Sequence, residues 1–450
     1  MYQTDELQKK WQPVLEHTDL PEIADAHKRS TVATLLENQE RAAAEQSAQS
    51  GGAFAPSLLG EAAPANATGN SVDNFDPVLI SLVRRSMPNL IAYDIAGVQP
   101  MTGPTGLIFA MRSRYSAQGG AEALFGEADT GFGSSASGNT ASVDTVGTGV
   151  GGRAAGAVAG TDPTGTYTVA TGMDTADAEK LGDTANNGFN EMAFSIEKVA
   201  VTAVSRALKA EYTMELAQDL KAVHGLDAEA ELANILSAEI LGEINREVIQ
   251  QINTQAKVGG AGTGAGIIAL ADATDNGGGR WQAERFQALA FRLEQEANTI
   301  AKETRRGKGN YVICSSSVAA ALSAAGALAY GSGITDGSLV VDNAGNTFAG
   351  TLKNGMKVYV DPYAGYEYAT VGYKGTNSYD AGIYYCPYVP LTQLKAVNAG
   401  TFQPKVGFKT RYGLVSNPFA VESDAAITEN LGTVGAGTNP YFRRNLITGV

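Results

Sequence analysis

Two polar segments near the start of the chain carry apolar residues at helical spacing. Their apolar positions are Leu7, Trp11, Val14 and Leu15 in the first segment and Val32, Leu35 and Leu36 in the second. A recurrence every three or four residues predicts two amphipathic helices within residues 1–50, with a break at Pro21. Residues 51–76 then change to Gly, Ala, Ser, Asn and Pro, which is the composition of a linker.

The longest helical pattern lies in the middle of the chain. From Ala228 to Gln255, apolar residues form one continuous stripe, and Asp227 is a good N-cap for this helix. At 1.5 Å per residue the helix is on the order of 40 Å long, which favours a spine lying across a sheet. Further helices are expected at 213–223, where Gly225 supplies the C-terminal stop, at 280–306 and at 316–325.

Alternating or short buried apolar runs predict strands elsewhere. The expected strands are 107–112, 192–205, 311–314, 357–361, 366–373, 383–394 and 408–415. Helices that are segregated from antiparallel strands give the class α+β. Between the first two strands, Gly, Ala, Ser and Thr fill most of residues 116–190, which suits a small β-rich insert or a flexible loop.

Composition narrows the classes of function. The formal net charge is −14, and the basic positions form only short clusters, so the chain has no stripe suited to nucleic acid. Cys314 and Cys386 are isolated and lack zinc-ligand spacing, which indicates reduced structural thiols. Neither a signal peptide nor an apolar run of membrane-spanning length is found, so we expect synthesis and assembly in a cytoplasm.

Candidate catalytic groups are few. The three histidines are His17, His27 and His224; two lie near the N-terminus, and His224 precedes a glycine as a residue at a helix C-terminus does. Residues 264–269 match G-x-G-x-x-A, but the dinucleotide fingerprint needs a strand before it and a helix after it. Asp272, Asp275 and Asn276 lack the spacing of a calcium loop and suit a polar loop. We therefore expect no cofactor, no metal and no enzymatic activity.

Several long segments resemble one family of proteins. The segments are 84–101, 216–225, 243–248, 371–375, 380–385, 408–413 and 441–444. The first reads RRSMPNLIAYDIAGVQPM and the second LAQDLKAVHG. In this order they are similar to the major capsid proteins of T-even-type tailed phages, and the resemblance covers nearly the whole chain outside 116–190 and 257–279.

The resemblance implies the capsid fold shared by tailed phages and herpesviruses. Its parts are an N-terminal arm, an extended loop carrying an insertion domain, a peripheral domain with a spine helix, and an axial domain. Carried over to this chain, they are a prosegment at 1–61, the arm at 62–77, the first part of the peripheral domain at 78–110, the extended loop at 111–205 with its insertion at 116–190, the peripheral helices at 206–256, and the axial domain with returning peripheral strands at 257–450.

The family also implies maturation by a prohead protease that cuts after Glu in Leu/Ile-x-Glu. At the family's position stand Leu59, Gly60, Glu61 and Ala62, within the linker. The same short motif ends at Glu22, Glu37, Glu243 and Glu429, so accessibility must select the bond that is cut. Residues 1–61 carry a net charge of −5, and their removal would leave −9 on the mature chain.

The expected function is a shell-building protein of the virion that forms hexamers around packaged DNA, in an icosahedral or prolate head. The expected partners are other copies of the chain, a vertex protein, the scaffold core and prohead protease, decoration proteins and a folding chaperone, but neither specific nucleic-acid binding nor a membrane. Two alternatives stay open. One is the paralogous vertex protein that forms pentamers, and the other is a carbohydrate-binding surface protein, suggested by the Gly/Thr/Ala-rich insert.

Overall fold

A computed structural model describes most of the chain and divides it into two compact units. One unit is built from Met1–Ile108 and Val199–Val450, and the other from Phe109–Lys198. The described residues are 2–16, 23, 25–49, 90–120, 123, 132–133, 145–146, 169–170, 172–173, 175–183, 188–260, 266–270, 281–329, 347–377, 379–397, 400, 403–417, 427–428, 433–434 and 437–449.

Apart from the short α4, which was not expected, the helices of the larger unit agree with those expected from the apolar spacing. They are α1 (Tyr2–Leu15), α2 (Ala26–Gln49), α4 (Ala92–Ile95), α6 (Met214–His224), α7 (Ala228–Gln255), α9 (Gln282–Thr304) and α10 (Ser316–Ala324). The expected caps are confirmed: the Asp227 carboxylate accepts a hydrogen bond from the Glu229 amide at 3.1 Å, and Gly225 ends α6 at a φ of 67°.

One sheet of the larger unit has four strands. Their order is β1 (Gly97–Val98), β14 (Ile383–Val397), β15 (Pro404–Ser416) and β6 (Val204–Glu211). β1 is an edge strand that pairs in parallel with β14, whereas the other neighbours are antiparallel. The β14–β15 register shifts between Pro387 and Val389, which leaves Tyr388 as a bulge residue.

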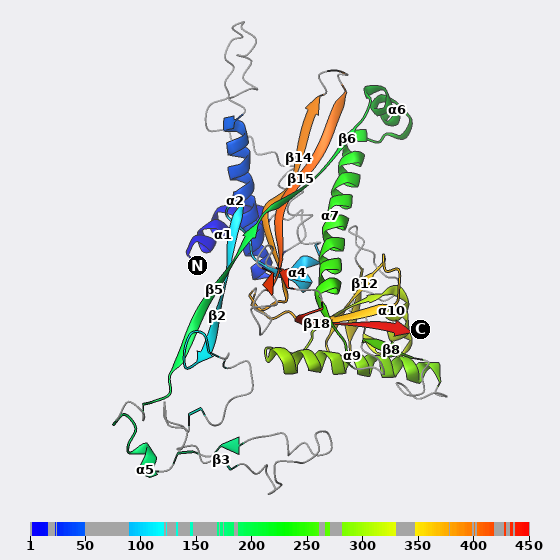
Figure 1. Cartoon of the computed structure of the whole chain (residues 1–450). Helices are drawn as coiled ribbons and strands as arrows, with labels where there is room; N and C mark the ends of the chain where they lie inside the picture. The colour runs from blue at the N-terminus through cyan, green and yellow to red at the C-terminus, as the bar shows by residue number, and fades with distance from the viewer. Residues whose placement is uncertain are drawn as a thin grey trace. The chain divides into compact units, whose positions relative to one another are not determined.

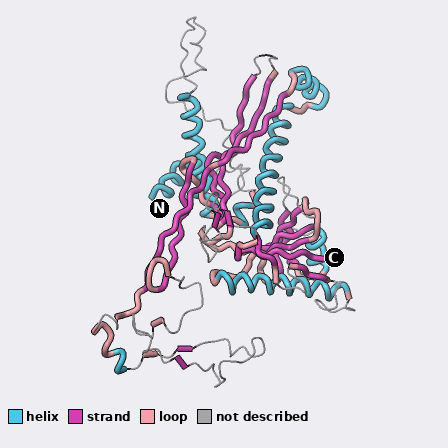
Figure 2. The backbone as a smooth tube through the Cα atoms, viewed as in Figure 1, coloured by secondary structure: helices cyan, strands magenta, loops and turns pink. Residues whose placement is uncertain are grey.

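The second sheet is larger and mixed. Its strands, in order, are β10 (Leu328–Ala329), β11 (Thr347–Leu352), β12 (Lys357–Asp361), β9 (Tyr311–Ser315), β13 (Tyr368–Gly372), β18 (Asn439–Thr448) and β7 (Ala256–Val258), with β8 (Ile267–Ala269) also paired to β18. The short strands β16 (Ile427–Thr428) and β17 (Thr433–Val434) pair with each other. Figure 2 shows the two larger sheets as separate groups of strands.

Both faces of the second sheet are covered, which explains why β9 is a continuous apolar run. Val312 and Cys314 lie in one core cluster with residues of α9 and α10. Tyr311 and Ile313, which point to the opposite face, lie in the other cluster with residues of α7. A strand that is buried on both faces needs no polar alternation.

The spine helix α7 connects the two sheets through one core. Its buried positions Ile240, Ile244, Val248, Ile249 and Ile252 form the predicted stripe. This stripe shares its cluster with Phe408 and Tyr412 of the first sheet and with Tyr441 and Phe442 of the second. Figure 1 shows α7 running beside β6 and ending near β18, with α9 lying across the second sheet.

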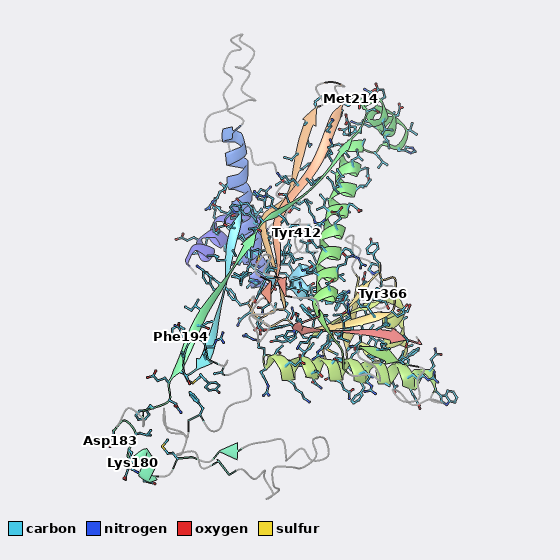
Figure 3. All side chains as sticks on the ribbon, in the orientation of Figure 1. Lys180, Asp183, Phe194, Met214, Tyr366 and Tyr412 are labelled. Carbon is cyan, nitrogen blue, oxygen red and sulfur yellow. The ribbon has the colours of Figure 1, made fainter. Side chains whose placement is uncertain are left out.

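A polar network fixes α7 to the first sheet. The Arg206 guanidinium of β6 donates to Glu243 at 2.8 Å and to Glu247 at 2.6 Å, both on α7, and to the Tyr412 hydroxyl at 2.5 Å. Tyr412, labelled in Figure 3, in turn donates to Glu247. Between the two glutamates in sequence, the buried Asn245 side chain accepts from the Ile91 amide at 3.1 Å and so ties the segment before α4 to the helix.

The smaller unit contains parts of two long paired strands. β2 (Thr105–Tyr115) pairs with β5 (Met192–Thr202), and the unit holds their portions from Phe109 and up to Lys198. Within the insert, the described elements are the antiparallel pair β3 (Thr145–Val146) and β4 (Val169–Ala170) and one turn of helix, α5 (Thr175–Ala178).

Three sequence expectations need correction. The single strand expected at 192–205 is two strands, β5 and β6, because the Ala203 amide turns to the Pro104 carbonyl. The strands are not all antiparallel, since β1–β14, β9–β12, β7–β18 and β8–β18 are parallel. Finally, β18 was not foreseen as a strand, because its buried positions include polar residues such as Asn439 and Asn445.

We expect Arg206→Met to lower the free energy of unfolding by about 1–3 kcal/mol, because it leaves Glu243, Glu247 and Tyr412 without their shared donor. The shift in the midpoint of thermal unfolding measures this loss. Lys395→Met is the control: Lys395 pairs with Glu229 on the same helix, but its side chain is 60% exposed, so we expect a change below about 0.5 kcal/mol. Equal effects of the two variants would contradict the structural role of Arg206.

Candidate functional site: an exposed apolar ribbon and a docked helix pair

The paired strands β2 and β5 expose large apolar side chains. Phe109 and Met111 are 53% and 69% exposed on β2, and Phe194 and Ile196 are 59% and 65% exposed on β5. Each pair is two residues apart, so its members share one face of their strand. Figure 3 shows Phe194 on this ribbon. A two-stranded ribbon with such side chains is only marginally stable alone, which favours a protein partner for this face.

The helices α1 and α2 form a unit of their own. The Lys10 ammonium binds Glu37 at 2.8 Å and Glu40 at 2.5 Å, and the Trp11 indole donates to Glu37 at 3.3 Å. The hydrogen bond from Lys10 is the main reason why the pKa of Glu37 lies below its ordinary value. Trp11 and Leu15 of α1 are buried with Leu35 and Leu36 of α2. The two helices therefore hold each other through both charge and apolar contact.

This helix pair docks on the first sheet through apolar side chains buried in a shared core and through hydrogen bonds to backbone carbonyls. The Asn38 amide donates to the carbonyls of Met101 at 2.7 Å and Tyr388 at 3.0 Å. A ring nitrogen of His27 lies 3.2 Å from the Val98 carbonyl, which can only accept. Residues 27 and 38 are eleven positions apart, or about three helical turns, so both side chains lie on one face of α2.

A cluster of charges lies where α2 begins. Lys28 pairs with Asp94 of α4 at 2.9 Å, and Asp25 accepts a hydrogen bond from the His27 amide at 3.0 Å. The half-buried Lys374 donates to the carbonyl of Tyr93, the residue next to Asp94. Burial lowers the pKa of Lys374 to about 8, although Asp94 partly opposes this effect.

The candidate cleavage residues Leu59, Gly60, Glu61 and Ala62 lie outside the described residues. So do Glu22 and Glu429, which end two of the competing motifs. The other two motifs are engaged in helices: Glu37 binds Lys10 and Trp11 within α2, and Glu243 binds Arg206 in the middle of α7. An extended-chain protease cannot bind these two without unfolding the helix.

The other residues considered for catalysis or binding end a helix, are buried, belong to a strand or lie outside the described residues. His224 ends α6 just before Gly225, as expected. Cys314 and Cys386 are free and buried, and burial raises the pKa of both thiols to about 12, so neither is a thiolate at neutral pH. Ile267–Ala269 is a strand, so the G-x-G-x-x-A match is not followed by the helix that a dinucleotide site needs. Asp272, Asp275 and Asn276 lie outside the described residues, as does His17.

In the part of the chain that the structure describes, no three His, Cys, Asp or Glu side chains cluster as metal ligands would. In the same residues, no helix is both long and apolar enough to cross a membrane.

Comparison with known proteins decides what kind of protein carries these features. Residues 72–447 match the sequence model of the family described as "Major capsid protein Gp23". The chain belongs to this family of phage capsid proteins. It is therefore a structural protein of the virion, with the α+β fold that the resemblance implied.

Relatives in this family match over nearly their full length. The major capsid protein of Vibrio phage KVP40 is 40% identical, with 99% of this chain and 100% of the relative covered. The major capsid protein of Enterobacteria phage T4 is 38% identical, with 99% of each covered. The capsid vertex protein of the same phage is 29% identical and matches only 56% of this chain and 58% of its own length. Similarity to the major capsid proteins is therefore both higher and more complete.

Two solved structures are also similar to this chain. One, titled "Mycobacterium phage Bobi", has a TM-score of 0.38 and 11% identity and covers 88% of this chain and 97% of its own. The other, "The capsid of Myoviridae Phage XM1", has a TM-score of 0.37 and 8% identity and covers 80% and 92%.

The docking residues of α2 were missed by sequence reasoning, which noted only its apolar positions. His27, Thr31, Thr34 and Asn38 recur at intervals of three and four on one face, and the last three are buried. A polar row at helical spacing beside an apolar stripe was the signal that could have found this interface.

We expect Lys374 to make stability depend on pH in the alkaline range. Its pKa is about 8 in the folded protein, against 10.5 when unperturbed. Below pH 8 both states are protonated and the full cost of burial is present; between pH 8 and 10.5 only the unfolded state keeps the proton, so stability rises with pH. Relative to Lys374→Met, the wild-type protein should gain on the order of 2 kcal/mol across this window.

Thermal unfolding of the wild-type protein and the Lys374→Met variant, measured side by side from pH 7 to pH 10, checks this prediction. The cysteine and tyrosine titrations are common to both proteins and cancel in the difference. A difference that stays constant over this range would show that Lys374 does not titrate as its surroundings indicate.

Proposed function

We propose that the chain builds the phage head by association into hexamers, which join through the extended loop and the N-terminal arm. The observation that carries this proposal is the exposed apolar ribbon of β2 and β5, in a chain whose family forms capsids. Each chain carries one such ribbon, so a neighbouring copy of the chain supplies one partner for each ribbon. Repeated heterologous contacts of this kind close into rings. In this assignment residues 111–205 are the extended loop, 116–190 its insertion and 257–450 the axial domain with returning strands.

We propose that the chain is a precursor and that the bond between Glu61 and Ala62 is cut during maturation. Two features support this site: its linker composition, and the helical engagement of Glu37 and Glu243, which disfavours two competitors. The family match begins at residue 72, beyond this bond. Loss of the prosegment makes the change irreversible, because its contacts cannot re-form once it is degraded.

The proposed role is that of a container, without enzymatic activity. The mature chain would carry a net charge of −9, which disfavours retention of DNA on the inner wall. The partners in this scheme are the vertex protein, the scaffold core, the prohead protease, a chaperone and decoration proteins. Retention of DNA by the mature protein at physiological salt would count against the scheme.

A vertex role is the second candidate, because the T4 vertex protein matches part of the chain. Copy number in the virion separates the two roles, since a hexamer-forming protein dominates the shell. The proposed carbohydrate-binding role has no support from the family to which the chain belongs.

Coexpression with a candidate scaffold and chaperone, followed by negative-stain microscopy, tests lattice formation. We expect shells, tubes or hexameric rings. A persistent soluble monomer in the presence of both partners would overturn the proposal.

The double variant Phe109→Ser/Phe194→Ser should abolish these assemblies and change the stability of the monomer by less than about 0.5 kcal/mol, because both rings are exposed. Lys198→Ser, an exposed change on the same strand that removes no apolar ring, is the control and should assemble normally. Sedimentation and microscopy report assembly, and thermal unfolding reports the fold. Normal shells from the double variant would contradict the role of the ribbon.

Glu61→Ala should leave residues 1–61 on every chain in the assembled shell, because the protease requires Glu before the cut. Intact-mass analysis of shells made with the protease measures this directly. In the wild type we expect a chain that begins at Ala62. Wild-type shells that retain Met1, or Glu61→Ala shells that are cut normally, would rule out this bond.

A further inference from the structure

The helix pair lies against an open edge of a sheet. β1 is the edge strand of the four-stranded sheet. The amides of Gln99 and Met101 donate to the Tyr385 and Pro387 carbonyls of β14, at 3.0 and 2.9 Å. Groups of alternate residues point in opposite directions along a strand, so Val98 faces away from β14, and its carbonyl meets His27 of α2.

Asn38 binds two backbone acceptors at irregular points of the sheet. Met101 lies beyond the end of β1, and Tyr388 is the bulge residue of β14, without a register partner on β15. The NH₂ group of Asn38 carries two hydrogens and serves both carbonyls at once. The Asn38 side chain is buried, so loss of this amide would remove a donor from both carbonyls at a site away from water.

The interface is built so that the helix pair can leave as one piece. Lys10 and Trp11 of α1 bind Glu37 of α2, so these contacts stay within the pair when it leaves the sheet. The face of α2 toward the sheet includes the buried Thr31 and Thr34, whose hydroxyls donate to carbonyls within α2 itself. Beside these threonines, α2 buries Val32, Ala33, Leu35 and Leu36 in the core cluster that it shares with the sheet, so departure of the pair also exposes apolar surface.

The charges at this interface also permit departure. Lys28 is the only link between the pair and Asp94 that the described residues record as an ion pair. When Lys28 leaves, Lys374 remains next to Asp94, since it already donates to the Tyr93 carbonyl. Asp94 therefore keeps a cation nearby in the processed chain, and no carboxylate is left uncompensated.

We propose that α1 and α2 are a detachable brace that clamps the edge strand β1 to the bulge of β14, so that the segment leading into β2 is held in its unprocessed arrangement until residues 1–61 are removed. The brace binds the rest of its own chain, residues 62–450, at the carbonyls of Val98, Met101 and Tyr388. The segment it holds, residues 97–104, runs directly into the extended ribbon, so release of the clamp gives this segment the freedom to shift.

This inference rests on the proposed removal of residues 1–61, and its test separates the two. A site for a sequence-specific protease is inserted after Glu61 in the full chain, and the folded protein is cut in solution. The fraction of fragment 1–61 that stays bound after dilution gives its affinity for residues 62–450. Hydrogen exchange at the Gln99 and Met101 amides reports how firmly their hydrogen bonds to β14 are held. Failure of Glu61 cleavage in shells would leave this test of the brace intact.

The decisive variant is Asn38→Asp, which keeps the shape of the side chain but replaces both N–H donors by a carboxylate facing two carbonyls. We expect it to weaken retention of the fragment by about tenfold or more, and to accelerate exchange at Met101 by a similar factor, even in the uncut chain. Gln12→Glu makes the same change of charge at an exposed position of α1. It also loses a donor, but only to the exposed Glu16 within the same segment at 3.1 Å, so we expect it to change neither quantity by more than about twofold.

The Val312 amide in the buried strand β9 is the internal reference and should exchange at the same rate in all variants. Faster exchange there would mean that the fold as a whole is damaged, and Asn38→Ala would then be measured in the uncut chain as the milder change. The proposal of a brace would be overturned if the wild type and the Asn38 variants retained the fragment equally well and exchanged the Met101 amide at the same rate.

Discussion

The structure of the larger unit depends on the burial of one side of α7. Its isoleucine and valine stripe is the common wall of a core to which both sheets contribute, and the Arg206 network fixes the helix to the first sheet at the same time. At 28 residues, α7 is the longest helix among the described residues. Its burial against both sheets keeps them from moving against each other, because a close-packed interior resists such shifts.

The contact of α2 adds polar partners to an apolar one. Both helices bury apolar side chains with almost no exposure, among them Ile244 and Val248 of α7 and Leu35 and Leu36 of α2. In α2, an amide, a histidine and a lysine also bind groups outside the helix pair. These polar contacts can be exchanged for contacts with water, which favours α2 over α7 as the helix that leaves in the proposed maturation.

The sequence predicted most of the regular elements, because their patterns are local. The stripe of α7 with its Asp227 cap, and the strand expected at 357–361, were both confirmed at their expected positions. What could not be predicted depends on partners distant in sequence. β18 is held in the sheet by neighbours on both sides, so its Asn and Arg residues carry no alternating pattern. The parallel pair of β1 with β14 joins segments nearly 300 residues apart, about which a local pattern says nothing.

The ribbon and the brace show the same limit for the candidate site. The two strands of the ribbon were predicted from apolar residues that can be read from the sequence, and their assignment to an extended loop stays a prediction of the family resemblance. The role of Asn38 depends on a bulge in β14, which arises from the register of that strand with β15. The residues around Asn38 carry no information on the pairing of β14 with β15, so the contact could not be predicted from the local sequence.

The open edge of β1 has a consequence for the order of events inside an infected cell. An uncovered strand edge is a template for pairing with any other chain. While α2 covers Val98 and Met101, that template is hidden. Under the proposed cleavage, the helix pair would therefore guard the edge against premature aggregation. A cut made late, within a closed shell, would uncover the edge only when neighbouring copies already surround each chain.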